Sequence, residues 1–253
     1  DQERLSMRVV AILQARMGST RLKNKMLIPL LDKPLVQHVI ERVQRATRLD
    51  DIVLAVPSRD AADFAPIANC RAWLYAYAGD EADLVERYLA AAQAFDADII
   101  VRIPCDNPCV DPEYIDRAVF DFMEKPYIYY SNTTGLVTQP YRGSIVQAVD
   151  GIGCEIFTVS TLKWLDNKSV GKPQWREHPH KYFLENYHYY LHPSDIRLDV
   201  NVQQEYECIK DIFDYFGHNQ FTTRDVVQYL TTKEVHHESI HREQPSGNSQ
   251  QRA

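Results

Sequence analysis

The stretch MRVVAILQARMGSTRLKNK, from Met7 to Lys25, joins a short apolar run to a loop rich in positive charge. The run MRVVAIL is typical of a buried strand. The loop from Leu13 to Lys25 carries four cationic side chains, one glycine, two hydroxyl residues and no acid. A strand that ends in such a loop predicts either a solvated turn or a cradle for a polyphosphate.

The chain then alternates between apolar runs and amphipathic stretches. Further buried strands are predicted where apolar runs recur, at 51–57, 72–79 and 97–104. Helices are predicted where apolar residues recur at helical spacing or acids fill the first turn, at 34–46, 80–95 and 111–125. Continuous apolar strands that alternate with helices indicate a parallel sheet covered on both faces. We therefore predict an α/β fold with a doubly wound, mostly parallel sheet.

The pattern becomes irregular in the second half. Residues 127–192 are dense in tyrosine, and their helices are unclear, which predicts an irregular, β-containing region for acceptor binding or dimerisation. The segment DIRLDVN, 195–201, predicts another strand, with helices after it. Apolar residues in 234–253 follow neither helix nor strand spacing. We therefore expect one domain over 7–233 followed by a disordered tail. Histidines at the start of that tail are better explained by disorder than by a metal site.

Composition limits the possible functions. The net charge of -7 over 253 residues argues against a general nucleic-acid binder, for which a basic stripe is expected. No apolar run approaches the ~20 residues of a membrane span, and no signal peptide is recognisable. An odd number of cysteines without a secretion signal favours free thiols in the cytoplasm. Cys105 and Cys109 have neither the usual zinc spacing nor a second pair of ligands.

The basic loop has the chemistry of a phosphate site. Gly18 would let the backbone approach a ligand closely, and consecutive amides there could bind an anion. Arg16, Arg21 and Lys25 add charged donors that match phosphate oxygens. The loop lacks both the Gly-Lys-Ser/Thr of a P-loop and the three glycines of a dinucleotide fingerprint. From these residues, phosphate binding is favoured over a solvated turn.

Acidic and amide side chains follow two other predicted strands. Asp106 comes directly after the run ending at 104, so its carboxylate should emerge at the same sheet edge as the basic loop. It could hold Mg²⁺ beside a triphosphate, or simply cap a turn. Asp111 is the better candidate for an N-cap, because it precedes a proline at a helix start. Asp199 and Asn201 are two residues apart and would share one face of a strand, where they could complete the metal shell.

Taken together, these motifs resemble those of one enzyme family. The chain is similar to the cytidylyltransferases that include the spore-coat polysaccharide synthesis enzymes and the CMP-sialate and CMP-Kdo synthetases. That family opens with Q-A-R-x-G-S-x-R-[LI]-P-x-K, which Gln14 to Lys25 match. Further matches follow in the family's order, in GDEADLVERYLAAAQ, ADIIVRIPCDNPCVDPEYID, DGIGCEIF and REHPHKYF.

The resemblance implies a Rossmann-like nucleotidyltransferase fold and the transfer of CMP from CTP to an acceptor oxygen, with release of pyrophosphate. It implies that Arg16, Lys25 and Asp106 are catalytic, with Asp106 on Mg²⁺. It also implies a nucleotide site built from Ala15, Arg16, Gly18, Ser19, Arg21, Lys25 and Ser58.

Two departures from the family pattern affect how closely its site residues correspond to those of this chain. The proline and small residue of the opening loop are Lys23 and Asn24 here. The late V-D-x-P-E-D motif begins with Val200 and Asn201, so an asparagine replaces the second metal aspartate. We expect Asn201 to be a metal ligand, either helped by Asp199 or alone, with Asp199 then paired to an arginine such as Arg197.

The acceptor is defined least by the sequence. Glu155 matches an acidic family residue, and an acceptor's carboxylate or phosphate could be bound by Arg142, Arg176 and His178. The segment REHPHKYF could equally be a helix start with a solvated charged face. A sugar acid is the expected acceptor. The alternative acceptors are an alditol phosphate and a phosphonate. The alternative function is that of a regulator that binds nucleotide without catalysis. The resemblance also implies a homodimer formed through 127–192.

Overall fold

The computed structural model describes most of the chain, in the ranges 7–69, 71–125, 127–132, 136–137, 148–186, 190–191 and 194–232. Arg142 and the expected tail at 234–253 lie outside the described residues. Within the described part, no helix has both the length and the apolar character needed to cross a membrane.

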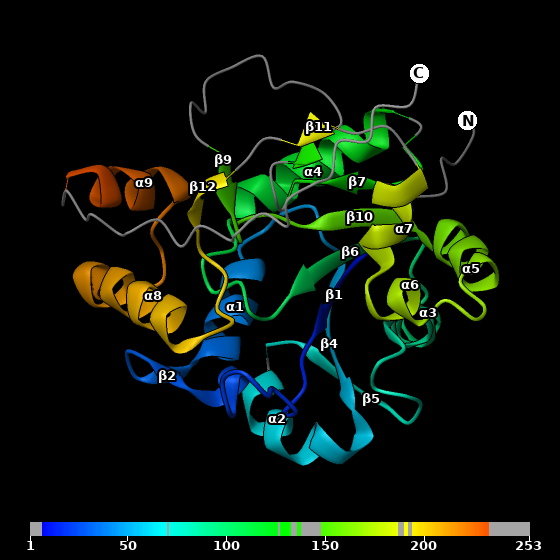
Figure 1. The fold of residues 1–253 in the computed structure, drawn as a ribbon, viewed down its shortest axis with the longest axis horizontal. Coiled ribbons are helices and arrows are strands. Elements are labelled where there is room, and N and C mark those ends of the chain that lie inside the picture. Colours follow the sequence, from blue (N-terminus) through cyan, green and yellow to red (C-terminus); the bar gives the residue numbers. More distant parts are fainter. Residues whose placement is uncertain are drawn as a thin grey trace, which may run out of the picture.

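A six-stranded sheet forms the centre of the fold, with the order β5-β4-β1-β6-β10-β7 (Figure 1). The first four of these strands are parallel, and β10 runs antiparallel to both β6 and β7. The strands are β1 (Val9–Gln14), β4 (Asp51–Pro57), β5 (Trp73–Tyr77), β6 (Ile99–Pro104), β7 (Tyr130–Ser131) and β10 (Glu155–Thr158). The predicted mostly parallel sheet is confirmed.

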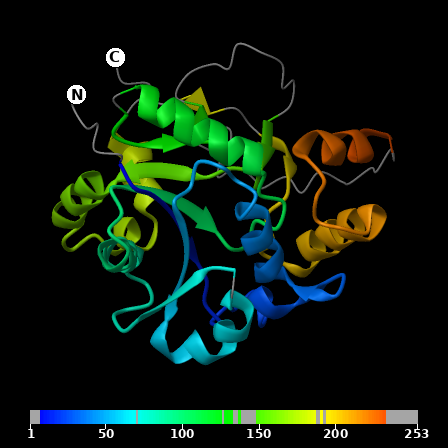
Figure 2. The same ribbon diagram turned by 180° about the vertical axis from the view of Figure 1, so that it is seen from behind.

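Helices cover both faces of the sheet, which explains why its strands are mostly apolar. One face packs against α1 (Leu35–Val43), α2 (Ala61–Ala68), α4 (Pro112–Glu124), α8 (Gln203–Phe216) and α9 (Thr223–Thr232). The other packs against α3 (Leu84–Ala94), α5 (Val159–Lys168), α6 (Pro173–Glu177) and α7 (Pro179–Asn186). Seen from behind in Figure 2, α4 lies along the sheet edge that carries β7 and β10.

The remaining elements are short. They are the strands β2 (Pro29–Leu30), β3 (Lys33–Pro34), β8 (Leu136–Val137), β9 (Ala148–Asp150), β11 (Tyr190–Leu191) and β12 (Ser194–Arg197), with the 3₁₀ helices η1 (Lys25–Leu27) and η2 (Ser58–Asp60). The 3₁₀ helices directly follow the basic loop and β4, so both lie at the edge where the candidate residues gather.

The second half of the chain is more regular than the sequence pattern indicates. Three helices, α5 to α7, occupy 159–186, where we expected none to be clear. The helical spacing of apolar residues is hard to recognise in the sequence because the buried face is partly aromatic. Tyr182 and Phe183 are buried, and Trp164 and Trp175 pack edge-on against Tyr182. Side-chain packing stabilises these short helices more than intrinsic propensity does.

The expected strand at 195–201 is shorter than predicted and belongs to another sheet. β12 ends at Arg197 and pairs in parallel with β9, outside the central sheet. Beyond it, the Leu198 amide donates to the Asp150 carbonyl at 2.9 Å, and the Val200 amide donates to the Asp106 carbonyl at 2.8 Å. Asp199 and Asn201 therefore lie in an extended segment that follows the strand and is attached to the loop after β6.

A fully buried arginine joins that loop to the turn between α8 and α9. Arg42, on α1, donates from Nε to the Val110 carbonyl at 2.6 Å. Its Nη1 donates to the Asn219 carbonyl at 2.6 Å, and its Nη2 to the Phe221 carbonyl at 3.1 Å. Burial lowers the pKa of Arg42 to about 10, which leaves it charged at neutral pH. One cation thus joins α1, the loop before α4 and the turn between α8 and α9.

Asp111 reinforces the same junction. It caps α4, as predicted, by accepting the Glu113 amide at 3.0 Å, with Pro112 in the first helical turn. Its other oxygen accepts the Thr223 amide at 2.8 Å and the Thr223 hydroxyl at 2.6 Å. The cap therefore also fixes the start of α9.

Replacing Arg42 should destabilise the fold strongly. We expect Arg42→Met to lower the free energy of unfolding by about 3–5 kcal/mol, because buried carbonyl groups lose their donors. Urea unfolding at neutral pH measures the loss. The matched control is Arg48→Met at an exposed position, which should change stability by about 0.5 kcal/mol or less. Equal stabilities for the two variants would contradict the proposed anchoring.

Candidate active site

The register of the parallel strands brings several loops together. Gln14, the last residue of β1, lies opposite Ala55 of β4 and Pro104 of β6. The chain therefore leaves β1 between the end of β4 and the loop after β6. Ligands of open parallel sheets bind at this carboxyl edge.

An ion pair links the basic loop to the loop after β6. Lys25 Nζ lies 2.9 Å from Asp106 Oδ2, and the Lys25 side chain is only 8% exposed. Asn24 precedes it with φ +53°, a left-handed conformation that asparagine tolerates better than most residues. This turn begins η1 and directs Lys25 back towards Asp106, so the departure at Asn24 suits the local backbone.

The late segment completes the same cluster. Arg21 Nη2 donates to Asn201 Oδ1 at 3.0 Å, and the Asn201 amide group donates to Asp199. Arg197 holds Asp199 through two short bonds from Nη2, at 2.7 and 2.6 Å. Of the two sequence-based alternatives, the geometry therefore matches an Asp199 paired with Arg197.

Asp106 and Asn201 supply the kind of oxygen that Mg²⁺ prefers. In the part of the chain that the structure describes, no group of three or more His, Cys, Asp or Glu side chains is gathered to hold a metal. An ion here would therefore take most of its ligands from water and from phosphate oxygens, as Mg²⁺ in nucleotide sites usually does. The donor set fits Mg²⁺ on those terms.

Hydrogen bonds fix the backbone of the basic loop on its other side. The Ala15 amide donates to the Ala55 carbonyl at 3.3 Å, and the Met17 amide donates to Asp60 Oδ2 at 2.9 Å. The Ser19 amide donates within the loop, to the Met17 carbonyl at 2.8 Å. Asp60 is buried and ends η2, so it positions the loop, a role that the sequence pattern did not reveal.

Ser58 joins two strand ends. Its hydroxyl donates to the Tyr77 carbonyl at 2.7 Å, which links the end of β4 to the end of β5. If Ser58 contacts a nucleoside as expected, it does so while its hydroxyl also joins two strands. The helix predicted at 80–95 begins later than expected: α3 starts at Leu84 with Asp83 as its cap, so Asp80 and Glu81 lie before the helix.

The acceptor-half residues Glu155 and Arg176 each have protein partners of their own. Glu155, on β10, is buried and ion-paired with Arg102 of β6. Arg176 is held between Asp83 at 2.6 Å and Asp166 at 2.8 Å, so it joins α6 to the start of α3 and to α5. Arg142 lies outside the described residues.

Two histidines approach Glu155 from the α6–α7 region. His180 Nδ1 is 4.0 Å from Glu155 Oε1, and the His178 and His180 rings are 5.7 Å apart. Burial lowers the pKa of His180 to about 4 and also lowers that of His178. Both rings are therefore neutral at pH 7. Arg102, within the apolar strand β6, and His180, on α7, were not identified from the sequence, because neither carries a local signal of its partner.

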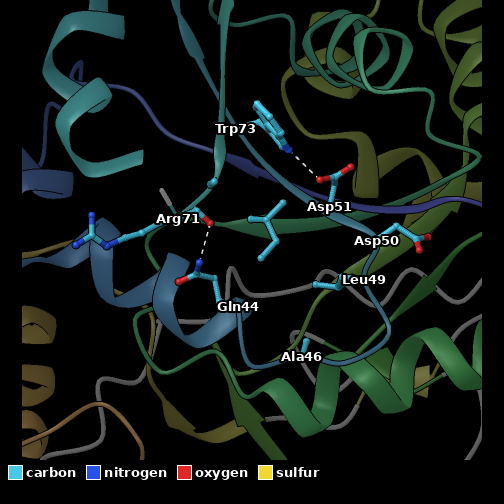
Figure 3. A pocket seen from close by; sticks show the side chains of 9 residues that line it. Gln44, Ala46, Leu49, Asp50, Asp51, Arg71 and Trp73 are labelled. Atoms are coloured by element: carbon cyan, nitrogen blue, oxygen red, sulfur yellow. Dashed lines mark hydrogen bonds between the residues drawn. The ribbon is translucent and has the colours of Figure 1, made fainter. Parts of the chain in front are cut away.

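A separate hollow of about 450 Å³ lies at the opposite edge of the sheet (Figure 3). It is lined by the starts of β4 and β5 and by residues near α1. Trp73 Nε1 donates there to Asp51 Oδ1 at 2.8 Å, and Gln44 Nε2 donates to the Arg71 carbonyl at 2.9 Å. None of the candidate residues line it, so it is distinct from the candidate site.

Comparison with known proteins identifies a family and several similar chains. A family model described as cytidylyltransferase matches residues 10–229. The spore coat polysaccharide biosynthesis protein SpsF of Bacillus subtilis is 27% identical over 220 residues, which cover 83% of this chain and 88% of SpsF. A cytidylyltransferase structure from Leptospira borgpetersenii is 28% identical with a TM-score of 0.76, covering 90% of this chain and 95% of that one.

A more distant structure shares the fold alone. CMP:2-keto-3-deoxy-manno-octonic acid synthetase, solved with CTP, is 15% identical with a TM-score of 0.61. The likeness covers 82% of this chain and 99% of that chain.

The half-buried His180 should make stability depend on pH. Its folded-state pKa of about 4 lies below its ordinary 6.5, so the unfolded chain binds the proton more readily. Stability present above pH 6.5 should therefore fall as the pH drops towards 4, by about 3 kcal/mol from this group. Urea unfolding between pH 7.5 and 4.5 measures the decline.

The variant His180→Gln should lose that part of the pH dependence, while His218→Gln, at an exposed histidine, should keep it. The groups that face His180 are Glu155, Arg102, His178 and Lys181, and all remain in both variants. An unchanged pH profile in His180→Gln would show that another group is responsible.

Proposed function

The chain belongs to the cytidylyltransferase family and is a CTP-dependent nucleotidyltransferase; on that premise, we propose that it transfers CMP to an oxygen of a sugar acid, with Mg²⁺ as cofactor. The observation that carries this proposal is the Lys25–Asp106 pair at the carboxyl edge of the sheet. It brings a cation suited to phosphate and a carboxylate suited to Mg²⁺ together from the loops after two neighbouring strands.

The pairing of the loop cations supports phosphate binding at this edge. Lys25, Arg21 and Arg16 each face a protein oxygen, on Asp106, Asn201 and Glu81. Triphosphate oxygens would replace or share these partners, since charged hydrogen bonds to phosphate are among the strongest available to arginine and lysine. The loop is thus organised before the nucleotide arrives.

In the proposed reaction, the acceptor oxygen forms a bond to the α-phosphorus of CTP while the bond from that phosphorus to the pyrophosphate oxygen breaks. The displaced electron pair leaves on pyrophosphate. Lys25 and Arg21 orient the phosphates for in-line attack and offset their charge, which is the main protein contribution in phosphoryl chemistry. Asp106 and Asn201 would hold Mg²⁺, which would offset the charge that develops on the departing pyrophosphate.

The choice of a sugar acid rests on the polar groups near Glu155. Arg102 and the neutral rings of His178 and His180 provide donors and acceptors suited to hydroxyl and carboxylate groups. An acceptor with an ionised oxygen needs no general base, and a hydroxyl acceptor would release its proton to solvent or to a neighbouring neutral side chain. An alditol phosphate or phosphonate would fit the same reaction.

The deciding experiment is pyrophosphate release with CTP and a panel of acceptors: sugar acids, alditol phosphates and phosphonates. We expect turnover with CTP, little with ATP or GTP, preference for a sugar acid, and loss of turnover when Mg²⁺ is chelated. Turnover with ATP above that with CTP would overturn the nucleotide assignment. CTP binding without turnover on any acceptor would instead indicate a regulator that has lost catalysis.

Lys25 should be far more important for catalysis than its neighbour Lys23. Removing one charged donor from a phosphate site costs about 2–4 kcal/mol of barrier, so Lys25→Ala should lower kcat by ~10²–10³-fold. The matched control is Lys23→Ala, an exposed lysine of the same loop, which should retain near-normal kcat. Similar kcat values for both variants, with intact folds by circular dichroism, would rule out Lys25 as a catalytic residue.

The proposed assembly is a homodimer formed through 127–192. Tyrosine suits interfaces that are buried yet partly polar, and Phe120, Met123 and Ile128 expose apolar side chains at the end of α4 and just after it. Light scattering at micromolar concentration should return twice the 29.3 kDa chain mass. A monomer mass would reject the proposal.

A further inference from the structure

Three arginines from three segments converge on one acidic residue, Glu81. Arg59, directly after β4, forms an ion pair with its carboxylate. Arg16 of the basic loop has its Nη1 4.0 Å from Glu81 Oε1. Arg87, on α3, donates from Nη2 to the Glu81 backbone carbonyl. Arg59 also meets a second carboxylate, since its Nε lies 3.6 Å from Asp60 Oδ1. Three guanidinium groups thus share two carboxylates, which leaves a local excess of one positive charge.

Arg87 indicates that an acceptor is missing beside this cluster. It is fully buried, and neither its Nε nor its Nη1 has a hydrogen-bond partner among the described residues. Burial is the main cause that lowers its pKa, and the charge of Arg16 lowers it further. Buried donors are nearly always satisfied, by protein, by water or by a ligand. An anion beside Arg16 and Glu81 would also offset the charge of Arg87.

Gly18 borders the same place. A Cβ built on Gly18 would meet nothing nearer than the Glu81 carboxylate at 3.9 Å and Arg59 Nη2 at 4.0 Å. Its φ is not in the left-handed region either, so neither sterics nor backbone conformation requires glycine here. The absence of a side chain instead leaves the loop backbone open to a group that takes the position of the Glu81 carboxylate.

We propose that the Glu81 carboxylate is an internal stand-in for phosphate, which the pyrophosphate portion of the nucleotide displaces from Arg16 and Arg59. This inference rests on the proposed function and adds two residues to it. Arg59 becomes a ligand of the terminal phosphates, and Glu81 becomes a competitor for the same cations. The ion pair keeps Arg59, whose side chain is 63% exposed, directed towards the site before binding.

The competition weakens binding and assists release. A phosphate must break the Glu81 contacts before it reaches the cations, and an exposed ion pair of this kind has a modest strength. Once the CMP moiety has been transferred, Glu81 can recover its partners as pyrophosphate leaves. Removing the carboxylate should therefore tighten pyrophosphate binding, whereas removing Arg59 should weaken it.

Isothermal titration of pyrophosphate with Mg²⁺ tests both parts. We expect the Kd of Glu81→Gln to be about fivefold lower than that of the wild type, and the Kd of Arg59→Ala about fivefold higher. The matched control is Glu207→Gln, which removes one negative charge from an exposed site on α8 and should leave the Kd unchanged. Rising salt should reduce the difference between wild type and Glu81→Gln, because screening weakens the competing pair.

Two results would overturn the proposal: a Kd for Glu81→Gln equal to or higher than that of the wild type, or an unchanged Kd for Arg59→Ala. Arg59 is exposed, so its variant remains informative even if Glu81→Gln folds poorly. Wild-type turnover of CTP, measured in parallel, separates this proposal from the function. Turnover combined with unchanged variant affinities rejects only the role of Glu81 and Arg59, and absence of CTP binding to the wild type rejects the function itself.

Discussion

The pairing of β1 between β4 and β6 is the constraint on which the candidate site depends. Gln14 is in register with Ala55 on one side and Pro104 on the other, and all three strands run in the same direction. The loops that follow these strands must therefore leave the sheet at one edge. Lys25 and Asp106 are 81 residues apart in the chain, yet this register brings them to hydrogen-bond distance.

The same edge concentrates positive charge in the basic loop. Each of three cations in the basic loop is balanced by an oxygen from a different part of the chain, in the order Glu81, Asn201 and Asp106 for Arg16, Arg21 and Lys25. These bonds hold long side chains in place. The Arg16–Glu81 pair is partly exposed and costs an incoming phosphate little, because exposed ion pairs are weak, whereas the Lys25 side chain is only 8% exposed. The stronger anchors lie below the site, where Arg42 and Asp111 join the loop after β6 to the C-terminal helices.

Much of this could be predicted from local patterns, and the failures have physical causes. The central strands and the cap at Asp111 were recognisable, because apolar runs and helix-start residues depend on near neighbours. The helices over 159–186 were missed because aromatic packing stabilises them. Asp60, Glu81 and Arg102 were missed as site residues, since each acts through a partner at least 22 residues away.

The sequence by itself determined the α/β class, the mostly parallel sheet and a basic loop at the end of the first strand, because these follow from the period of apolar residues and from local composition. Only the tertiary structure decided which acids meet that loop. Asp199 and Asn201 flank Val200, whose amide bonds to the Asp106 carbonyl, and Glu81 reaches the loop because α3 begins three residues later. Contacts between distant segments depend on strand register and helix ends, and neither is encoded by any single motif.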